Sequence, residues 1–422
     1  MSLEKIVVTG GHKLNGDVTI SGAKNAVLPI IVATLLTEDK CLLHDVPHLA
    51  DVQTIKDVLG SLGAQMEQDG YDLTIDCGSV TRTEAPYDYV QKMRASVLIM
   101  GPLLARFGKA KLSLPGGCAI GTRPIDLHLK GLEALGANVH VSDEGVRADV
   151  DGRLKGATIL LRVPSVGATE NLMMAASLAE GTTYIENAAE EPEIVDLANL
   201  LNSMGADVRG AGTSQIRING VESLHGAEHT IIPDRIEAGS YLLAGAITGS
   251  HIRVHNCIAA HLRPILDKIV DSGAEIIVDE KANIVEVIGS DEILPVDVKT
   301  LPYPGFPTDM QSQFMAYMAV ATGTSQFLET IFENRYMHVD ELRKMGANIK
   351  VDGRTAFVEG VPQLYGAEVK ATDLRAGAAL IIAALAAEGE STITELHHLE
   401  RGYEDLIGKF QQIGAKIERI SE

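Results

Sequence analysis

The sequence predicts an α/β protein of two domains, each built from three copies of one helix–strand unit. The pair Gly-Ala occurs six times at regular steps of about 70 residues, which is too regular for chance. Runs of small apolar residues end at a glycine and are followed by β-branched residues, as when a helix leads into a strand. The length of 422 residues also exceeds what one compact core usually holds.

The repeated unit can be followed along the chain. The Gly-Ala pairs lie at Gly63-Ala64, Gly136-Ala137, Gly205-Ala206, Gly273-Ala274, Gly346-Ala347 and Gly414-Ala415. Small-residue helices are expected to begin near Ala23, Arg94, Ala168, Ile236, Met310 and Arg375. Strands are expected to follow five of them, over residues 41–46, 182–187, 251–256, 325–332 and 391–396. A second helix then leads to each Gly-Ala pair.

The most apolar of these helices predicts where the core lies. Residues 376–387 are apolar on every side, and the run is too short to span a bilayer. A helix of this kind has to be buried. We therefore expect such helices at the centre of each domain, with sheets around them.

Composition excludes several classes of function. The formal net charge is −21 and the pI is about 5.0, so the field of the protein repels nucleic acids and anionic membranes. Aromatic residues make up 4% and tryptophan is absent, which argues against platforms for stacking bases. Four cysteines without regular spacing predict a reducing compartment, and the first residues lack the apolar core of a signal peptide, so we expect a cytoplasmic protein.

Residues 114–129 offer a reactive group on a loop. Pro115, Gly116, Gly117 and Gly121 forbid regular structure there, so the thiol of Cys118 is expected to be exposed. The cation of Arg123 and the carboxylate of Asp126 follow, with His128, in a segment whose two-residue alternation predicts a strand or a tight turn. The other cysteines have apolar neighbours and are expected to be buried, namely Cys41, Cys77 and Cys257.

The first residues of the apolar helices are unusually polar. They are Lys24, Asn25, Arg94, Thr169, Glu170, Asp234, Arg235, Asp309, Asp373 and Arg375. Several helix N-termini directed at one place would bind an anion even in an acidic protein. The alternative is that Asp234, Asp309 and Asp373 are helix N-caps, and for Asp309 capping and catalysis are compatible.

These motifs together resemble a known family. The run Leu-Pro-Gly-Gly-Cys, followed by Arg-Pro-Ile-Asp-Leu-His, resembles the active-site loop of enolpyruvyl transferases that act on UDP-N-acetylglucosamine. Residues 21–25, 306–311, 373–375 and 401–403 resemble the same family in the same order, so the resemblance covers essentially the whole chain. It implies two inside-out α/β barrels of three units each, with the active site in the cleft between them. The implied domains are residues 22–232 and residues 1–21 plus 233–422.

The resemblance implies a reaction. The enolpyruvyl group of phosphoenolpyruvate is transferred to the 3-hydroxyl of UDP-N-acetylglucosamine, and phosphate leaves, which is the first committed step of peptidoglycan synthesis. Cys118 matches the proton donor; its thiol is mostly protonated at neutral pH, whereas nearby Arg123 favours the thiolate, and both states remain open. Asp309 matches the carboxylate that meets the sugar hydroxyl, either as general base or to orient it. Lys24 and Arg401 complete the implied catalytic set.

The resemblance also implies two sets of binding residues. For phosphoenolpyruvate they are Lys24, Asn25, Arg123, Arg375 and Arg401, since cations suit its phosphate and carboxylate. For UDP-N-acetylglucosamine they are Arg94, Arg123, Pro124, Ile125, Asp126, Leu127, Ser165, Val166, Gly167, Asp309 and Ile331. Some members of the family carry a basic residue just before the serine, where this chain has Val163 and Pro164.

Two other functions are compatible with this pattern. The sister enzymes that make 5-enolpyruvylshikimate 3-phosphate share the implied fold but lack a cysteine on a Pro-Gly-Gly loop, so Cys118 argues against that acceptor. A catalytically silent protein that binds UDP-sugars is the other alternative, and the joint match at Lys24, Cys118, Asp309 and Arg401 argues against it. The sequence has no metal-ligand spacing, P-loop or dinucleotide fingerprint, so no cofactor is expected.

Overall fold

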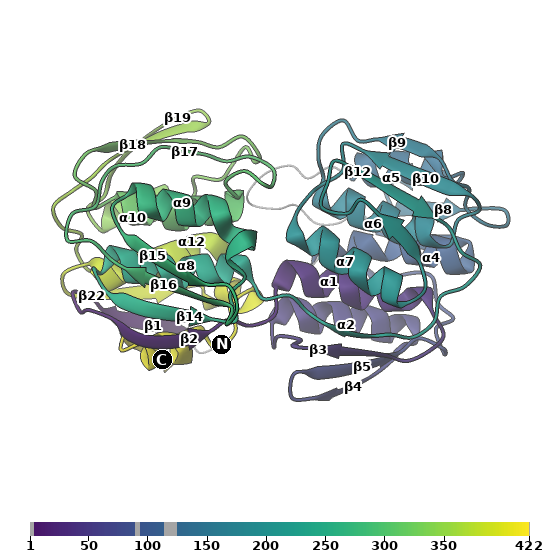
Figure 1. Ribbon diagram of the computed structural model, residues 1–422, viewed down its shortest axis with the longest axis horizontal. Coiled ribbons are helices and arrows are strands. Elements are labelled where there is room, and N and C mark those ends of the chain that lie inside the picture. Colours follow the sequence, from purple (N-terminus) through teal and green to yellow (C-terminus); the bar gives the residue numbers. More distant parts are fainter. Residues whose placement is uncertain (1–3, 89–92, 114–124, 422) are drawn as a thin grey trace. The chain divides into compact units, whose positions relative to one another are not determined.

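The computed structural model describes residues 4–88, 93–113 and 125–421, which form a mixed α/β fold in two compact units. The middle unit begins at Gly22 and ends at Ile232, and the terminal unit combines the stretch up to Ser21 with the stretch from Pro233 onward. Figure 1 shows the purple strands β1 and β2 beside the much later strands β14 and β22 in the terminal unit. The predicted two-domain α/β class is confirmed.

The described part of the middle unit contains three sheets and the helices that cover them. The strands are β3 (Cys41–His44), β4 (Gln65–Asp69), β5 (Asp72–Asp76), β6 (Lys109–Leu112), β7 (Asn138–Ser142), β8 (Gly145–Asp149), β9 (Thr158–Leu160), β10 (Thr182–Glu186), β11 (Asp207–Arg209), β12 (Gln215–Asn219) and β13 (Glu228–Thr230). The helices are α1 (Lys24–Ala33), η1 (Thr34–Leu36), α2 (Ala50–Leu62), η2 (Arg94–Ile99), α4 (Met100–Phe107), α5 (Asp126–Ala134), α6 (Val166–Ser177) and α7 (Pro192–Ser203).

The described part of the terminal unit is built in the same way. Its strands are β1 (Glu4–Thr9), β2 (Asn15–Thr19), β14 (His251–His255), β15 (Glu275–Asp279), β16 (Ile284–Ile288), β17 (Val298–Lys299), β18 (Thr324–Leu328), β19 (Asn348–Asp352), β20 (Thr355–Glu359), β21 (Glu368–Lys370), β22 (Glu390–Thr394) and β23 (Lys416–Ser421). Its helices are α8 (Arg235–Ile247), η3 (Ala259–Leu262), α9 (Arg263–Asp271), η4 (Thr308–Met310), α10 (Gln311–Met318), α11 (Val339–Lys344), α12 (Leu374–Ala386), η5 (Leu396–Arg401) and α13 (Leu406–Gln412).

One strand order recurs among the sheets of the described residues. In five of the six sheets a short parallel pair is continued by two antiparallel strands, as in β9-β10-β12-β11 and β17-β18-β20-β19. The sixth sheet, β6-β8-β7, has three strands, and an isolated parallel bridge from Glu84 to Lys111 stands where the others have their parallel partner. Five of the sheets of the described residues therefore share one strand order, and the sixth resembles it.

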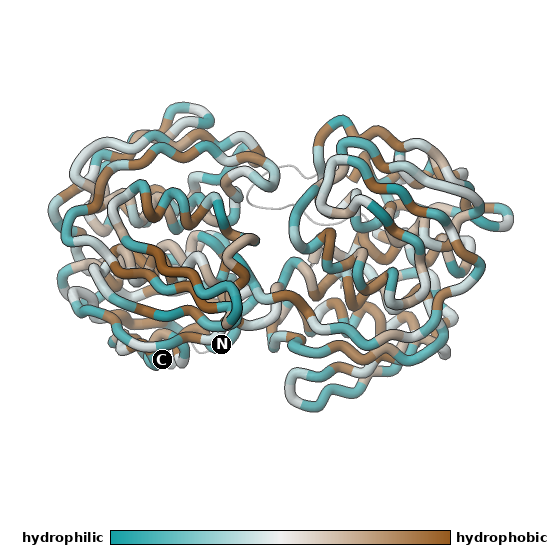
Figure 2. Tube along the Cα trace, in the orientation of Figure 1, coloured by the Kyte–Doolittle hydropathy of each residue, from teal (hydrophilic) through white to brown (hydrophobic). Residues whose placement is uncertain are grey.

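Apolar helices form the core of each unit. In the terminal unit α8, α10 and α12 pack on one another, and every residue of α8 is buried. Residues 374–385 of α12 are all buried as well, as predicted for the apolar run 376–387. Figure 2 shows brown, hydrophobic segments inside the units and teal, hydrophilic ones at tips such as the β4–β5 hairpin. Helix burial therefore supplies most of the core.

The Gly-Ala pairs end helices through a left-handed glycine. All six glycines have a positive φ, between 88° and 113°. After α2, for example, the N–H of Ala64 donates to the carbonyl of Leu59 at 3.1 Å, which closes the last turn. A residue with a Cβ is strained at such a φ, so the glycine sets the point where the helix stops and the next strand begins.

Two predicted boundaries differ from the structure by more than two residues. The strand predicted over residues 325–332 ends at Leu328, because Glu329 takes up the N–H groups of Ile331 and Phe332 with its side chain and bends the chain away from the sheet. The helix predicted to begin near Arg94 starts with the 3₁₀ turn η2 and becomes α-helical at Met100.

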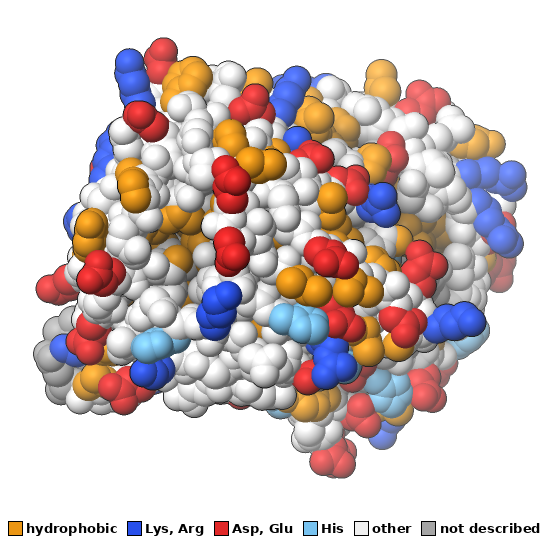
Figure 3. All heavy atoms as spheres, turned by 60° about the vertical axis from the view of Figure 1, so that its left-hand side comes forward, with side chains coloured by type: hydrophobic (Ala, Val, Ile, Leu, Met, Phe, Trp, Pro, Cys, Tyr) orange, Lys and Arg blue, Asp and Glu red, His pale blue; other side chains and the backbone are white. Residues whose placement is uncertain are grey.

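Charged side chains are interspersed on the surface. On the face drawn in Figure 3, red acidic side chains alternate with blue basic ones and with scattered hydrophobic groups. Several acidic residues are paired, as in Asp17 with Arg253 at 3.1 Å. Among the described residues, none of the helices has the length and hydropathy needed to cross a membrane.

Candidate active site

Asp309 lies between two arginines in the terminal unit. It belongs to η4, the turn that opens α10. Its Oδ1 accepts a hydrogen bond from Arg335 Nη2 at 3.0 Å, and its Oδ2 accepts one from Arg375 Nη2 at 2.8 Å. The arginine side chains are 3% and 5% exposed, whereas that of Asp309 is 26% exposed. Two buried cations thus hold the carboxylate in place, and part of it still reaches the surface.

Electrostatics hold this cluster in its charged form. Burial is the largest single influence and lowers the pKa of Arg375, but Asp309, Tyr403 and Asp234 together raise it more, so the net shift is upward and the guanidinium stays protonated. Arg335 Nη2 also donates to the carbonyl of Thr308 at 3.4 Å. A carboxylate that neutralises two buried guanidinium groups is well placed to orient a hydroxyl group, and it gains less by accepting a proton.

Polar side chains support the cluster from the core. Gln313 Nε2 donates to the carbonyl of Asp309 at 2.8 Å and lies 3.4 Å from the hydroxyl of Tyr403. The hydroxyl of Tyr403 also bonds to that of Ser240 at 2.9 Å, and the Arg375 guanidinium lies 5.8 Å from the centre of the Tyr403 ring. Helices α8, α10 and α12 and the turn after η5 therefore all contribute to the position of Asp309.

The aspartates at two helix starts are N-caps, as the alternative interpretation predicted. Asp373 Oδ1 accepts from the N–H groups of Arg375 at 2.8 Å and Ala376 at 3.1 Å, which caps α12. Asp234 caps α8 in the same way, through the N–H groups of residues 236 and 237. The cap of α12 fixes the first turn that carries Arg375.

Two more predicted residues belong to the terminal unit. Arg401 is the last residue of η5 and is partly buried. Ile331 lies in the turn after β18, where its N–H donates to Glu329 Oε1 at 2.8 Å. The structure thus joins Asp309 and Arg375 directly and places Arg401 and Ile331 in the same unit.

Lys24 is held by an ion pair in the middle unit. It is the first residue of α1, with Asn25 next to it, and its Nζ lies 2.8 Å from Asp51 Oδ2. The two side chains are 12% and 6% exposed. Asp51 lies in the first turn of α2, and its link to Lys24 was not predicted, because nothing in the sequence shows which of the many acidic residues would reach that lysine. The pair fixes the direction of the lysine.

The predicted diphosphate loop opens α6. Ser165 is its N-cap and accepts a hydrogen bond from the N–H of Ala168 at 3.3 Å, while Val166 and Gly167 form the first turn. Three residues before the serine, Arg162 Nη2 lies 3.0 Å from Asp126 Oδ2. This arginine was also missed, although it is a basic residue close to the position where some family members carry one.

The strand or tight turn predicted around Asp126 and His128 is wrong. Asp126 begins α5, with Ile125 at the N-cap position and Leu127 in the first turn. Residues 128, 131 and 132 are buried at helical spacing, and an acidic residue in the first turn is favoured by the helix dipole. The alternation of polar and apolar residues at 126–129 is too short to identify a strand, because the helical period becomes visible only when residues 131 and 132 are included.

His128 is a buried neutral histidine below this loop. Its Nδ1 lies 3.0 Å from Asn171 Nδ2, and a Cβ added at Gly167 would lie 3.3 Å from its ring. Burial lowers the pKa of His128 to about 4, although Asp126 acts to raise it. The neutral ring lies between α5 and α6 and leaves little room for a side chain at position 167. Because residue 167 is a glycine, no side chain there covers the backbone at the start of α6.

Some predicted residues lie outside the described part of the chain. These are Cys118, Arg123 and Pro124, and of Arg94 only the backbone is described, at the start of η2. The other cysteines are buried, as predicted, and burial raises the pKa of Cys77 to about 11 and that of Cys257 to about 12. Within the described ranges, no group of three or more His, Cys, Asp or Glu side chains is placed to hold a metal ion.

Comparison with known proteins places these residues in a family. The family described as EPSP synthase (3-phosphoshikimate 1-carboxyvinyltransferase) matches residues 8–410. A protein of Halalkalibacterium halodurans named UDP-N-acetylglucosamine 1-carboxyvinyltransferase 1 is 57% identical over 421 residues, which cover 100% of this chain and 95% of the relative. A relative from Carboxydothermus hydrogenoformans, named UDP-N-acetylglucosamine 1-carboxyvinyltransferase 2, is 55% identical, and both chains are covered in full.

Solved structures agree with this assignment. The enolpyruvyl transferase NikO from Streptomyces tendae superposes with a TM-score of 0.90 at 26% identity, with both chains covered in full. An EPSP synthase from Acinetobacter baumannii superposes with a TM-score of 0.77 at 18% identity, covering 99% of this chain and 100% of that chain. The latter likeness is one of fold alone.

Proposed function

The chain belongs to the EPSP synthase (3-phosphoshikimate 1-carboxyvinyltransferase) family, and on that premise we propose that it transfers the enolpyruvyl group of phosphoenolpyruvate to the 3-hydroxyl of UDP-N-acetylglucosamine. The observation that carries this proposal is the identity of 55–57%, over the whole chain, to relatives named for that acceptor. The EPSP synthase structures are only 18–19% identical. The enzyme therefore supplies a precursor for peptidoglycan synthesis.

The proposed reaction is an addition followed by an elimination. A proton is added to C3 of phosphoenolpyruvate, the sugar oxygen attacks C2, and the hydroxyl proton is released. The bond from C2 to the phosphate oxygen then breaks, phosphate leaves, and C3 loses a proton to restore the double bond. Cys118 is the proposed donor of the first proton, a role for which a thiol that is mostly protonated at neutral pH is suited.

Cations hold the donor substrate in this proposal. Lys24, Asn25, Arg123, Arg375 and Arg401 are assigned to the phosphate and carboxylate of phosphoenolpyruvate. The ion pair of Lys24 with Asp51 and that of Arg375 with Asp309 support this role, because each fixes a long cationic side chain before substrate arrives. Preorganised cations also stabilise the charge that grows on the departing phosphate.

The acceptor is assigned to five places in the chain. Asp309 is proposed to orient the 3-hydroxyl, a choice over general base that its two arginine partners support. The N–H groups at the start of α6, after Ser165, suit the diphosphate. Residues 94 and 123–127 are proposed to bind the remainder of the nucleotide, and Ile331 to contact the sugar through its backbone.

The proposed architecture is a pair of barrels built from repeated units. We infer that the recurring strand order and the six left-handed Gly-Ala glycines come from six copies of one unit, three in each of two inside-out barrels. The proposed domains are residues 22–232 and residues 1–21 plus 233–422, a division that the two compact units support. The proposed location is the cytoplasm.

The experiment that tests this function compares two acceptors. Purified protein is given phosphoenolpyruvate with UDP-N-acetylglucosamine, or with shikimate 3-phosphate, and phosphate release is measured. Release with the nucleotide sugar alone is expected. Release with shikimate 3-phosphate alone would indicate the sister activity, and binding of the nucleotide sugar without release by folded protein would indicate a silent binding protein.

A further inference from the structure

Glu329 is a buried carboxylate that joins two segments of the candidate site. It directly follows β18 and is 1% exposed. Its Oε1 accepts hydrogen bonds from the N–H of Ile331 at 2.8 Å and the N–H of Phe332 at 3.1 Å. Its Oε2 accepts one from the hydroxyl of Thr308 at 3.0 Å. One side chain therefore ties the turn at 331–332 to the residue that precedes Asp309.

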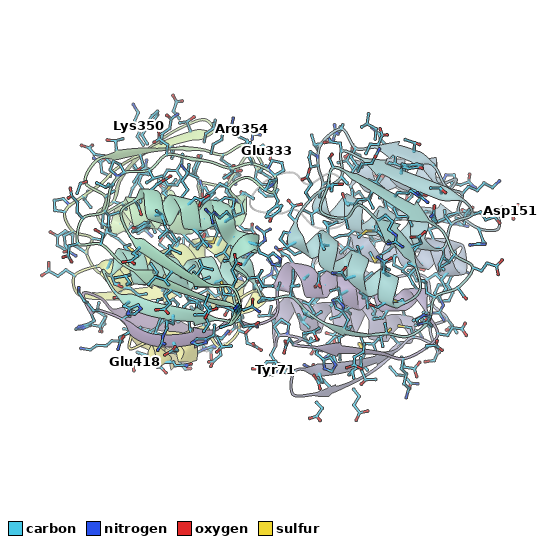
Figure 4. The ribbon with its side chains drawn as sticks, in the orientation of Figure 1. Tyr71, Asp151, Glu333, Lys350, Arg354 and Glu418 are labelled. Carbon is cyan, nitrogen blue, oxygen red and sulfur yellow. The ribbon has the colours of Figure 1, made fainter. Side chains whose placement is uncertain are left out.

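The backbone around Glu329 is fixed to its neighbours. Its N–H donates to the carbonyl of Arg354 at 2.9 Å, and its own carbonyl accepts from Arg354 Nη1 at 3.4 Å. The hydroxyl of Thr330 donates to the carbonyl of Thr300 at 2.6 Å. Figure 4 shows Arg354 beside Glu333 at this end of the unit, and the two side chains form an ion pair at 3.8 Å. Glu329 is therefore fixed in position, and it holds the turn at 331–332 through its side chain.

The negative charge of Glu329 strengthens this arrangement. A carboxylate can accept all three hydrogen bonds, because both of its oxygens are acceptors. A glutamine of the same shape can keep its one oxygen on the two backbone N–H groups and turn its NH₂ group to the oxygen of the Thr308 hydroxyl, but these hydrogen bonds are then neutral, and the hydrogen of that hydroxyl loses the acceptor that Glu329 supplies. A buried donor left without an acceptor is costly. The charge thus strengthens the coupling of the two segments, and a neutral substitute holds them more weakly.

The coupled segments carry the two residues assigned to the sugar. Ile331 lies in the turn, and Asp309 follows Thr308 in η4. Arg335 Nη2 donates both to the carbonyl of Thr308 and to Asp309 Oδ1. With its N–H groups taken up by Glu329, the turn can offer carbonyl oxygens to a ligand. A shift of the turn would move such a carbonyl relative to the carboxylate of Asp309.

We propose that Glu329 is a positioning residue for the sugar acceptor, which holds the turn at 331–332 at a fixed place relative to Asp309. This inference rests on the proposed function, because it takes the acceptor from there. It predicts that Glu329 affects recognition of the nucleotide sugar and leaves recognition of phosphoenolpyruvate nearly unchanged.

The test is steady-state kinetics of Glu329→Gln with both substrates varied. The KM for UDP-N-acetylglucosamine is expected to rise about tenfold or more, the equivalent of one charged hydrogen bond, while the KM for phosphoenolpyruvate stays within about twofold. Glu341→Gln is the matched control: Glu341 is a carboxylate 4% exposed in the same unit, which accepts from Lys344 Nζ at 2.8 Å and from the N–H of Lys370 at 3.0 Å. It is expected to lower the melting temperature and leave both KM values as in wild type.

Thr308→Val tests the same role of Glu329 if Glu329→Gln does not fold. It removes one of the three donors, and we expect a smaller rise in the same KM that does not add to that of Glu329→Gln in the double variant. Unchanged KM values in folded variants, or equal rises for both substrates, would overturn the role of Glu329. If the wild type does not use the nucleotide sugar at all, the proposed function fails, and this inference fails with it.

Discussion

At the scale of single residues, Asp309 is tightly constrained among the described residues of the candidate site. Two guanidinium groups at 2.8 and 3.0 Å neutralise a carboxylate that still reaches the surface. Asp309→Asn is therefore expected to lower kcat by about 100-fold, since the hydroxyl loses its charged partner, and to lower the melting temperature, since two buried cations lose their counter-ion. Phosphate release and thermal unfolding measure the two effects.

Asp340→Asn is the control for Asp309→Asn. Asp340 also pairs with an arginine, Arg343, at 2.7 Å, but its side chain is 79% exposed, and exposed pairs contribute little. It should leave kcat and the melting temperature as in wild type. A kcat of Asp309→Asn within a few-fold of wild type would show that Asp309 has no part in the reaction.

His128 makes the stability of the middle unit depend on pH. Burial lowers its pKa from 6.5 to about 4, so the folded state binds the proton less well than the unfolded state. Its contribution is therefore fully present above pH 6.5 and is lost as the pH falls toward 4, by about 3 kcal/mol in all. In urea unfolding at pH 7 and pH 4, His128→Gln should lose about that much less than wild type.

His140→Gln is the matched control for this pH effect. His140 is an exposed histidine on β7 of the same unit, so its removal should leave the loss of stability between pH 7 and pH 4 as large as in wild type. Equal losses in wild type and in His128→Gln would mean that His128 is not the group that titrates.

For the candidate site, the sequence points to individual residues but not to their partners. The resemblance pointed to Lys24, Asp309 and Arg375, and the structure joins the last two directly. Asp51, which pairs with Lys24, and Glu329, which supports Ile331, lie in ordinary acidic positions. Their contacts depend on how the helices and strands pack, which a single sequence with 57 acidic residues does not reveal.

At the scale of secondary-structure elements, the helix ends could be predicted best. Each Gly-Ala pair marks a real helix end because the conformation there requires glycine. Prediction failed where a local pattern was short, as at Asp126, the start of a helix, and where a side chain ends a strand, as Glu329 does after β18. In the second case Glu329 takes up the N–H groups of Ile331 and Phe332, and it also accepts from the hydroxyl of Thr308, 21 residues earlier in the chain.

The left-handed glycines predict a stability test. Gly136 has a φ of 94°, and a Cβ there would meet nothing within 4 Å, so Gly136→Ala should cost about 1 kcal/mol through backbone strain alone. Gly136→Asn should cost less, because asparagine tolerates this conformation. Urea unfolding of the three proteins measures the difference.

Gly60 offers the opposite case. It is an exposed position inside α2, where an added Cβ would make an ordinary contact of 3.7 Å with Met66, so Gly60→Ala should gain up to about 1 kcal/mol of stability. A loss of stability at Gly60, or none at Gly136, would contradict the conformational argument.

At the scale of the whole molecule, the two units differ in how the chain builds them. Strand β1 lies between β22 and β23, and β2 pairs with β14, so the terminal unit needs the first 21 residues as well as the second half of the chain. Ser21 is also held in this unit. Its hydroxyl accepts a hydrogen bond from Lys409 Nζ at 2.7 Å, and its carbonyl accepts one from the N–H of Asp234 at 2.9 Å. The described residues of the middle unit all lie between Gly22 and Ile232.

This difference predicts how fragments behave. Residues 22–232 should fold alone and melt cooperatively, whereas residues 233–422 should not form native structure without residues 1–21, because a central strand of one sheet is missing. Circular dichroism during heating measures both. A cooperative transition in the fragment 233–422 would contradict the role given to β1.

The transfer of carbon from phosphoenolpyruvate to the nucleotide sugar is the central activity proposed for the whole molecule. The most direct measurement is NMR of the reaction of phosphoenolpyruvate labelled with ¹³C at C2, in the presence of UDP-N-acetylglucosamine. The predicted result is that the label appears in an enol ether on the sugar 3-oxygen while phosphate accumulates in equal amount. Label that stays in phosphoenolpyruvate, or that appears only in pyruvate through hydrolysis, would contradict it.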